Sequence, residues 1–266
     1  MAYSSISMQY LGKIMRKIRK ILLDFLSKRS ITHKLVNSVI ARIDFFSSAL
    51  VNDRDNLLLD LIRINKNFKK SQLNQDIFAL LTCQFKRDGY FVEVGANDGY
   101  NLSNTLLLEA EFNWNGLLIE ANPKYETSLK TRKAHIEISA VSDFTGSVTF
   151  KDGGLYGGIS KHLDTTHKKK LLQAKEIIVN STSLTEILKT HRAPSIIDFI
   201  SIDVEGCEVT IVDQMFSIDH HHEYLCGVIE VNRRQSDTSY IVKTLKRNGY
   251  KILPVSQTKH DIFFYK

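Results

Sequence analysis

The sequence predicts an α/β fold: a mostly parallel sheet covered by helices on both faces and preceded by a helical N-terminal arm. From residue 71 onward, apolar segments of strand length alternate with helical stretches, which is typical of such a sheet. The last two strand-like segments, 251–255 and 261–265, are joined by a short polar stretch and predict an antiparallel hairpin. A chain of 266 residues is long enough for one large domain with an appendage. We therefore expect an arm over residues 1–70 and a domain over residues 71–266.

Five strand-then-helix units and the closing hairpin account for most of the domain. The expected strands are residues 90–94, 116–120, 136–141, 147–150, 177–179, 198–204, 227–231, 251–255 and 261–265. The expected helices are residues 75–85, 102–111, 125–132, 184–191, 209–215 and 238–248. Ligands of open parallel sheets bind beyond the carboxyl ends of the strands, so candidate functional residues are sought there.

The positive charge of the chain is concentrated in the arm. Residues 1–34 contain eight Lys and Arg residues and one acidic residue, so they account for the whole net charge of +7. Residues 11–26 place apolar side chains on one helical face and basic side chains on the other. Such a helix is suited either to peripheral contact with an anionic membrane, through residues 8–30, or to docking on protein. The neutral remainder has no basic stripe, so we expect no nucleic-acid partner.

Cysteine usage and hydropathy favour a cytoplasmic protein. Cys83, Cys207 and Cys226 form no CxxC pair and predict reduced, buried thiols. No apolar segment approaches the roughly 18 residues that span a bilayer. Charges at residues 13–20 also interrupt any signal-peptide pattern. We therefore expect a cytoplasmic location, at the inner membrane face if the arm binds lipid.

The first expected strand of the alternating region ends in the segment Glu93-Val94-Gly95-Ala96-Asn97-Asp98-Gly99. Its glycines permit a tight turn and close approach of a ligand, and the next helix begins with free backbone donors. A dinucleotide fingerprint requires glycine where Asn97 stands, and Asp98 would repel a pyrophosphate. An amine or a sulfonium, in contrast, would be attracted by Glu93 and Asp98. The turn therefore predicts a site for a cationic cofactor without phosphates.

The next two strands add candidates for the nucleoside part of that cofactor. Glu120 ends the second strand, 25 residues after Gly95, close to the spacing of about 20 at which a carboxylate accepts ribose hydroxyls. The small and apolar residues at the end of the third strand, Ala140 and Val141, suit a flat adenine, with Ser142 or Asp143 placed to reach its amine.

The strongest cluster of candidate catalytic residues lies at the ends of two later strands. Asp203, Glu205 and Glu208 fall within six positions, and Glu230 and Asn232 follow the next strand. Carboxylates this close together raise at least one pKa, and such groups concentrate at functional sites. Asp203, Glu230 and Asn232 also offer the hard oxygen ligands that Mg²⁺ prefers. A general base and a magnesium site both remain open.

The ordered set of these motifs resembles the FkbM family of S-adenosylmethionine-dependent methyltransferases, from about residue 71 to residue 265. Its landmarks here, in chain order, are Ser71-Gln72, Gln75-Asp76, residues 89–99, Ser103-Asn104-Thr105, Trp114 with Gly116, residues 119–123, Gly157-Gly158-Ile159, residues 201–206, and Glu230 with Asn232. The resemblance implies a Rossmann-like class I methyltransferase fold with a mostly parallel seven-stranded sheet and an antiparallel C-terminal strand. Ala121 stands where many relatives have proline.

The resemblance also implies roles for individual residues. The methionine part of S-adenosylmethionine would be held by Glu93, Gly95, Ala96, Asn97, Asp98 and Gly99. Glu120 would bind the ribose, and Ala140, Val141 and Ser142 would border the adenine. Asp203 would lie between cofactor and acceptor, with Glu205 and Glu230 as further catalytic candidates. The expected acceptor contacts are Tyr156, His162 and Asn232.

The family methylates sugars, polyketides and other natural products, so the predicted activity is O-methylation of a sugar or glycan hydroxyl in polysaccharide or natural-product biosynthesis. The alternative is a non-catalytic nucleotide-binding or membrane-attached scaffold that retains the fold. The acidic residues at the strand ends argue against that alternative. An NAD-dependent sugar-modifying enzyme is disfavoured by Asn97 and Asp98. The oligomeric state stays undetermined.

Overall fold

The computed structural model describes residues 71–163, 169–219, 221–231, 235–253 and 261–266. The predicted amphipathic arm, residues 1–70, lies outside the described residues, as does Asn232. Among the helices that are described, none is long and apolar enough to cross a membrane.

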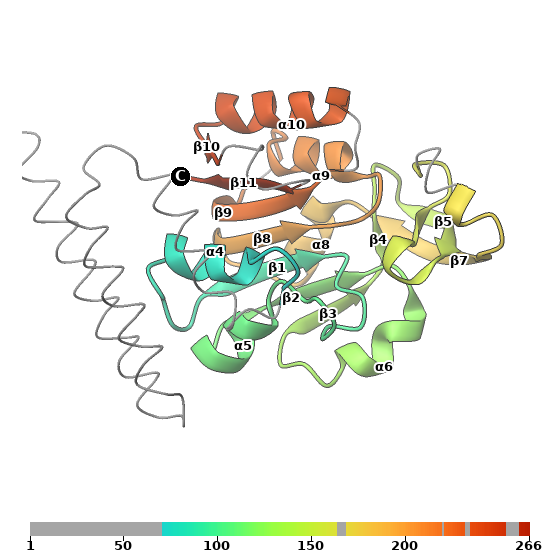
Figure 1. The fold of residues 1–266 in the computed structure, drawn as a ribbon, viewed down its shortest axis with the longest axis horizontal. Coiled ribbons are helices and arrows are strands. Elements are labelled where there is room, and N and C mark those ends of the chain that lie inside the picture. The colour runs from blue at the N-terminus through green and yellow to red at the C-terminus, as the bar shows by residue number, and fades with distance from the viewer. Residues whose placement is uncertain (1–70, 164–168, 220, 232–234, 254–260) are drawn as a thin grey trace, which may run out of the picture.

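The described residues form a seven-stranded sheet at the centre of the domain (Figure 1). In spatial order its strands are β10 (Lys251–Ile252), β11 (Asp261–Tyr265), β9 (Glu223–Glu230), β8 (Ile196–Ile202), β1 (Tyr90–Val94), β2 (Asn115–Glu120) and β3 (His135–Ile138). The pairs from β9 to β3 are parallel, whereas β11 runs antiparallel to both β9 and β10. The mostly parallel sheet and its antiparallel closing strand are therefore confirmed.

Helices cover both faces of this sheet, because alternate strand residues point to opposite sides. Phe91 packs into one hydrophobic cluster with α4 (Gln75–Thr82) and α5 (Leu106–Phe112), while its neighbour Val92 packs into the other. That second cluster includes residues of α8 (Leu184–Thr190), α9 (Glu208–Met215) and α10 (Gln235–Arg247). Figure 1 shows α9 and α10 above the sheet and α5 below it. The predicted two-sided covering is thus present.

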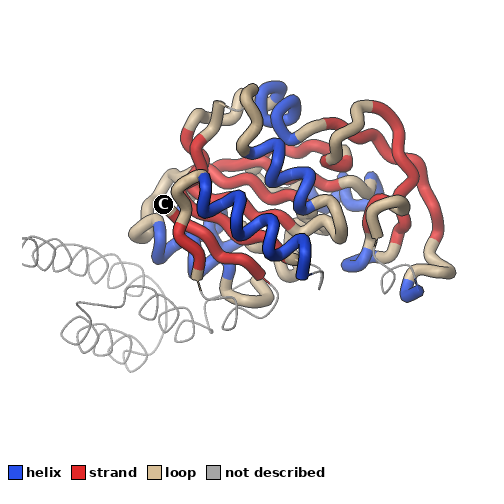
Figure 2. Tube along the Cα trace, turned by 90° about the horizontal axis from the view of Figure 1, so that it is seen from above, coloured by secondary structure: helices blue, strands red, loops and turns tan. Residues whose placement is uncertain are grey.

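A second sheet accounts for the strands that do not belong to the parallel series. Its order is β4 (Ala140–Val141), β7 (Lys175–Thr182), β5 (Gly146–Asp152) and β6 (Gly158–Ile159), with β5 antiparallel to both neighbours. The segment 177–179, predicted as one of the parallel strands, lies in β7 instead. Its residues alternate between exposed and covered positions, as expected for an antiparallel sheet with one face in water. Figure 2 shows this sheet beside the main one.

The expected strand 136–141 is divided between the two sheets. Residues up to Ile138 belong to β3 and pair with β2, whereas Ala140 and Val141 form β4 and pair with β7. The chain therefore passes from the main sheet to the second sheet at Ser139, a buried residue. This crossing places the second sheet next to the carboxyl ends of the parallel strands, where ligands bind.

Candidate functional site

A cavity of about 200 Å³ lies at the carboxyl ends of β1, β2, β8 and β9, and the second sheet contributes to its wall. It collects most of the residues predicted for the site. Those that line it are Glu93, Gly95, Ala96, Asn97, Glu120, Ala140, Val141, Tyr156, Asp203, Glu205 and Glu230. Asp98, Gly99, Ser142 and His162 are predicted site residues that do not line it.

The turn after β1 approaches β8 as closely as a backbone can. Gly95 has φ +89°, and a Cβ atom added to it would lie 1.8 Å from the carbonyl oxygen of Asp203. Asp203 donates its backbone N–H to the oxygen of Val94 at 2.9 Å, so the two strand ends are held together. Asn97 follows with φ +50°. Only glycine fits at position 95, because it lacks both the Cβ atom and the resulting restriction on φ.

Glu120 is positioned by the backbone on either side of it. Its Oε2 accepts the N–H of Asn97 at 2.8 Å, and its Oε1 accepts the N–H of Asn122 at 2.7 Å. The net effect of burial and these bonds is a raised pKa, with burial the largest cause. The backbone of Ala121 provides a further hydrogen bond to Glu120, so at least one of the roughly four acceptor positions of the carboxylate remains for a ligand in the cavity. This is the arrangement expected of a residue that accepts ribose hydroxyls.

Glu93 lines the cavity, but its carboxylate is engaged by the loop that follows the turn. It accepts hydrogen bonds from the Ser103 hydroxyl at 3.1 Å, the Asn104 N–H at 2.7 Å and the Thr105 hydroxyl. These contacts also explain why α5 begins at Leu106 and not near residue 102 as predicted. The structure therefore shows Glu93 holding this loop, in addition to any contact with a cofactor.

Asp98 folds back on its own turn and does not face the cavity. Its carboxylate accepts the N–H groups of Tyr100 at 2.9 Å and Asn101 at 2.8 Å. Burial raises the pKa of Asp98, but these backbone bonds outweigh that effect and leave the pKa lowered. The predicted attraction of a cationic cofactor by Asp98 thus has no direct contact to support it.

Ser142 likewise lies outside the cavity. Its hydroxyl is fully buried and hydrogen-bonds the Ser181 hydroxyl at 2.7 Å, across β4 and β7. Ala140 and Val141, in contrast, line the cavity. The third strand end therefore supplies an apolar border without the hydroxyl that was expected beside it.

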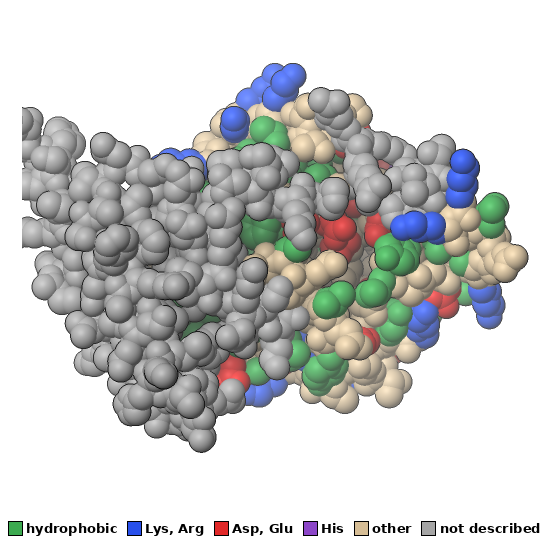
Figure 3. All heavy atoms as spheres, viewed as in Figure 1, with side chains coloured by type: hydrophobic (Ala, Val, Ile, Leu, Met, Phe, Trp, Pro, Cys, Tyr) green, Lys and Arg blue, Asp and Glu red, His purple; other side chains and the backbone are tan. Residues whose placement is uncertain are grey.

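Three carboxylates meet in the cavity at the ends of β8 and β9. Asp203, Glu205 and Glu230 each offer an oxygen, and these oxygens lie within 4.8 Å of one another. Burial, and then the charge and hydrogen bond of Glu230, raise the pKa of Asp203 well above its usual value. Figure 3 shows acidic side chains in a hollow bordered by hydrophobic ones. The cluster can take up a proton, or it can provide hard oxygen ligands to a cation.

Two further buried carboxylates surround this cluster without lining the cavity. Burial raises the pKa of Glu208 to about 7, although its Oε1 accepts the Gly206 N–H at 2.9 Å. Burial and the charge of Glu230 raise the pKa of Asp261 to about 7, and its Oδ2 accepts from Gln75 at 2.8 Å. Asp261 stands opposite Glu230 in the pairing of β9 with β11. Three neighbouring carboxyl groups, those of Glu230, Glu205 and Glu208, therefore act on Asp203, and Asp261 acts on Glu230.

Glu205 has a left-handed backbone conformation, with φ +56°, that residues other than glycine rarely adopt. A Cβ atom added to Gly158 of β6 would lie 3.1 Å from the Glu205 oxygen. The second sheet thus packs directly against the backbone of the acidic cluster. Strained residues of this kind concentrate at functional sites.

The loop between β5 and β6 provides the outer wall of the cavity. It contains the short helix η2 (Gly154–Tyr156), and Leu155 and Tyr156 line the cavity while remaining largely exposed. The Nζ atom of Lys170 lies 4.5 Å from the centre of the Tyr156 ring. His162 does not line the cavity but lies against the backbone beside Glu205: its backbone oxygen would be 2.6 Å from a Cβ atom on Gly206.

The cavity also contains residues that sequence reasoning did not assign to the site. Asn101, Leu102 and Asn104 line it from the loop after β1, and Gln72 lines it from the segment before α4. Asn101 and Leu102 follow Gly99 closely in the sequence, and Gln72 and Asn104 are among the family landmarks. Such signals identify a segment, but they do not identify the side chains that face a ligand.

Comparison with known protein families agrees with the geometry of the site. A family model described as "Methyltransferase FkbM domain" matches residues 93–252. The comparison with curated proteins gave no match.

Several solved structures are similar to the chain. The methyltransferase FkbM of Methylobacillus flagellatus KT has 14% identity over 84% of this chain, with a TM-score of 0.41. The match spans 62% of that longer chain. A precorrin-6y C5,15-methyltransferase of Geobacter metallireducens GS-15 has 15% identity, with 70% of this chain and 75% of that chain covered and a TM-score of 0.35. A putative caffeoyl-CoA O-methyltransferase of Staphylococcus aureus has 11% identity, with coverages of 86% and 99% and a TM-score of 0.38.

Proposed function

Because the chain belongs to the FkbM methyltransferase family, whose model covers residues 93–252, we propose that it transfers a methyl group from S-adenosylmethionine to a hydroxyl of a sugar or glycan. One observation carries the proposal: a single cavity holds Glu120 on one side and the carboxylates of Asp203, Glu205 and Glu230 on the other. The first suits a ribose, and the second suits a hydroxyl that must lose its proton.

The cofactor half of the cavity extends from β1 to β4. The turn at Gly95 to Asn97 is suited to the methionine part, Glu120 to the ribose hydroxyls, and Ala140 with Val141 to the adenine. All of these residues line the same cavity. The carboxylates that line the cavity also favour a cofactor that carries a sulfonium and an amine, because opposite charges attract.

The acceptor half lies between the carboxylate cluster and the β5–β6 loop. Tyr156 offers a ring face for a sugar, and Leu102 and Leu155 add apolar surface at the mouth. Methyl transfer is an in-line displacement, so its rate depends on alignment of the acceptor oxygen with the methyl group and sulfur. A wall built on both sheets is suited to hold the acceptor in that line.

The carboxylate cluster has two candidate roles. As a general base, Asp203 would accept the hydroxyl proton, a role for which a raised pKa is suited. As ligands, Asp203 and Glu230, with Asn232 from outside the described residues, would hold a cation such as Mg²⁺, which would lower the pKa of the hydroxyl. The oxygen atoms of the described carboxylates are close enough for either role.

Replacing Glu120 with Gln should weaken binding of S-adenosylmethionine by about tenfold or more. The change removes a charged acceptor and turns an NH2 group toward one of two backbone N–H donors, and bonds to charged acceptors contribute about 1.5–3 kcal/mol. Titration calorimetry on the purified protein measures the effect. Glu186→Gln, on an exposed residue of α8, is the matched control. Equal affinity of the Glu120 variant and the wild type would contradict the assigned ribose site.

The same calorimetry separates the proposed enzyme from a non-catalytic scaffold. The enzyme should bind S-adenosylmethionine and S-adenosylhomocysteine, whereas a scaffold that has lost the site should bind neither. Mass spectrometry of glycans from a deletion strain then tests the acceptor class. Loss of a methyl substituent from a surface or secreted glycan is the expected result, and an unchanged glycan profile would redirect the search to other hydroxyl compounds.

For the basic arm, we propose peripheral contact with an anionic membrane, where lipid-linked glycans are assembled. The proposal rests on the charge and apolar pattern of residues 8–30. Removal of residues 1–34 should abolish sedimentation with vesicles that contain phosphatidylglycerol, while binding of S-adenosylmethionine stays unchanged. Docking of the arm on protein predicts instead that the full-length chain fails to sediment with these vesicles.

A further inference from the structure

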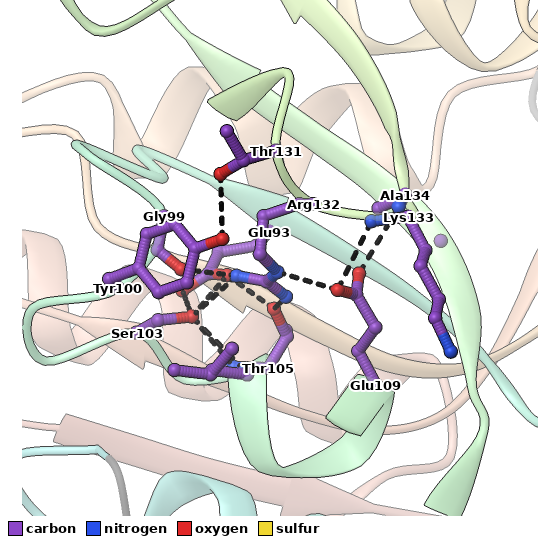
Figure 4. Close-up of polar contacts among 12 residues, drawn as sticks. Glu93, Gly99, Tyr100, Ser103, Thr105, Glu109, Thr131, Arg132, Lys133 and Ala134 are labelled. Carbon is purple, nitrogen blue, oxygen red and sulfur yellow. Dashed lines mark hydrogen bonds and ion pairs between the residues drawn. The ribbon is translucent and has the colours of Figure 1, made fainter. Parts of the chain in front are cut away.

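A buried arginine lies directly behind the loop that lines the cofactor half of the cavity. Arg132 follows α6 (Glu126–Leu129), and its side chain is 1% exposed. Its Nε donates to Glu109 Oε1 at 2.9 Å, and Glu109 also accepts the N–H groups of Lys133 and Ala134. Figure 4 shows Arg132 between Glu109 and the loop. The residue does not line the cavity, so it acts on a ligand only through its neighbours.

The guanidinium group holds this loop at three points. Nη1 donates to the backbone oxygen of Gly99 and to the Ser103 hydroxyl, and Nη2 donates to the Thr105 hydroxyl at 3.2 Å. The two hydroxyl groups in turn donate to Glu93. Each hydroxyl therefore accepts from a cation and donates to an anion, an arrangement in which successive hydrogen bonds strengthen one another.

The loop needs such support because its backbone is strained. Leu102 has φ +59° and Asn97, just before the loop, has φ +50°, a backbone region that residues other than glycine rarely adopt. Such residues keep their conformation only where the surrounding structure imposes it. Arg132 contacts Gly99 and Ser103, one on each side of Leu102. Between these contacts lie Asn101 and Leu102, both of which line the cavity.

Charge balance gives the arginine a second effect. Glu93 and Glu109 are both buried, and an unpaired buried carboxylate strongly destabilises a fold. Burial raises the pKa of Glu93, whereas the hydrogen bonds of Thr105 and the charge of Arg132 act in the opposite direction. Loss of the guanidinium therefore affects both the geometry of the loop and the charge that holds it.

We propose that Arg132 is a positioning residue of the cofactor site: paired with Glu109 outside the cavity, it fixes residues 99–105 in the conformation that binds S-adenosylmethionine. The inference rests on the proposed function for the identity of the ligand. The conformation of the loop itself does not depend on that identity.

Two variants of Arg132 test the proposal against a matched control. Arg132→Lys keeps the charge but cannot reach all of its partners, and Arg132→Met also removes the charge. We expect the dissociation constant of S-adenosylmethionine to rise about tenfold for the first and more for the second, similar to the roughly 10- to 100-fold losses that follow replacement of residues that orient metal ligands. Lys130→Met, on a side chain 65% exposed beside α6, should leave it unchanged.

Hydrogen exchange distinguishes positioning from general stabilisation. In the Arg132 variants the amides of residues 99–105 should exchange faster, while those of β8 stay protected. Uniform loss of protection together with unchanged affinity of the folded protein would overturn the proposal. If Arg132→Met does not fold, Thr105→Val removes one of the two hydroxyl links, and Thr105→Ser should restore the wild-type affinity.

Failure of the proposed function is distinguishable from failure of this inference. A wild-type protein that does not bind S-adenosylmethionine would refute the cofactor assignment, and with it the ligand named here. Selectively faster exchange of residues 99–105 in the variants would then still show that Arg132 positions the loop. If these residues did not exchange faster, the positioning role of Arg132 would be refuted as well.

Discussion

Replacing Asp203 with Asn should reduce methyl transfer by at least about a thousandfold, while S-adenosylmethionine binds within about threefold of the wild-type affinity. The asparagine keeps the size of the side chain but neither accepts a proton nor ligates a cation as a carboxylate does, and losses of this size are typical of a residue that acts in the reaction itself. Glycan methylation in a complemented deletion strain measures turnover, and calorimetry measures binding. Full methylation by the variant would remove Asp203 from the mechanism.

The fold of this variant is expected to be at least as stable as that of the wild type once the pH exceeds the raised pKa of Asp203. The pKa of Asp203 is raised in the folded protein, first by burial and then by Glu230, so the charged form is disfavoured by folding. A carboxyl group whose pKa is raised by folding contributes stability at pH values below its ordinary pKa. This contribution is lost as the pH rises through the raised pKa. The asparagine side chain does not titrate, so the variant has no such loss. Thermal unfolding at two pH values therefore separates a catalytic defect from a folding defect.

The pH and metal dependence of the wild type distinguish the two roles of the carboxylate. A general base predicts a rate that falls as pH decreases through the raised pKa of Asp203 and that is unaffected by a chelator. A metal ligand predicts loss of activity with a chelator and recovery with Mg²⁺. Glu186→Gln is the matched control, because Glu186 is an exposed residue of α8 that does not line the cavity. Its turnover should remain within about threefold of that of the wild type.

The parts of the site that the sequence predicts are those at strand ends. Parallel strands bring their carboxyl ends to one edge of the sheet, so Gly95, Glu120, Asp203 and Glu230 could be placed together without knowledge of any contact. Buried strands are also the clearest elements in this sequence, since their apolar runs end in glycine, asparagine or acidic residues. In the structure, all four of these residues line one cavity.

The parts that could not be predicted depend on contacts between loops. The roles of Glu93 and Asp98 are set by residues 100–105, which were expected to lie mostly in a helix and instead form a loop bound to both carboxylates. The hydroxyl of Ser142 is hydrogen-bonded to that of Ser181, 39 positions away, because the chain crosses to the second sheet before it. Alternating polarity in β7 was visible in the sequence, but the strand it pairs with was not.

Replacing Gly95 with Ala should destabilise the domain by more than about 3 kcal/mol and abolish binding of S-adenosylmethionine, because two costs add. A residue other than glycine is strained at φ +89°, which costs about 1 kcal/mol or more. In addition, the new Cβ atom would lie 1.8 Å from the Asp203 oxygen and 2.9 Å from its carbonyl carbon. These are backbone atoms, so the contact is relieved only if β1 and β8 separate at the ends that carry the site.

Gly249→Ala is the control that isolates the first cost. Gly249 has φ +82°, close to that of Gly95, but apart from its chain neighbours no atom of the described residues lies within 4 Å of an added Cβ. It should lose about 1 kcal/mol of stability through the backbone alone and retain full binding of the cofactor. Chemical denaturation of both variants, with calorimetry on each, gives the difference. If the two variants lose equal stability, the close approach of β1 to β8 is not what requires glycine at position 95; a much larger loss at Gly95 ties the geometry of the turn to the position of Asp203.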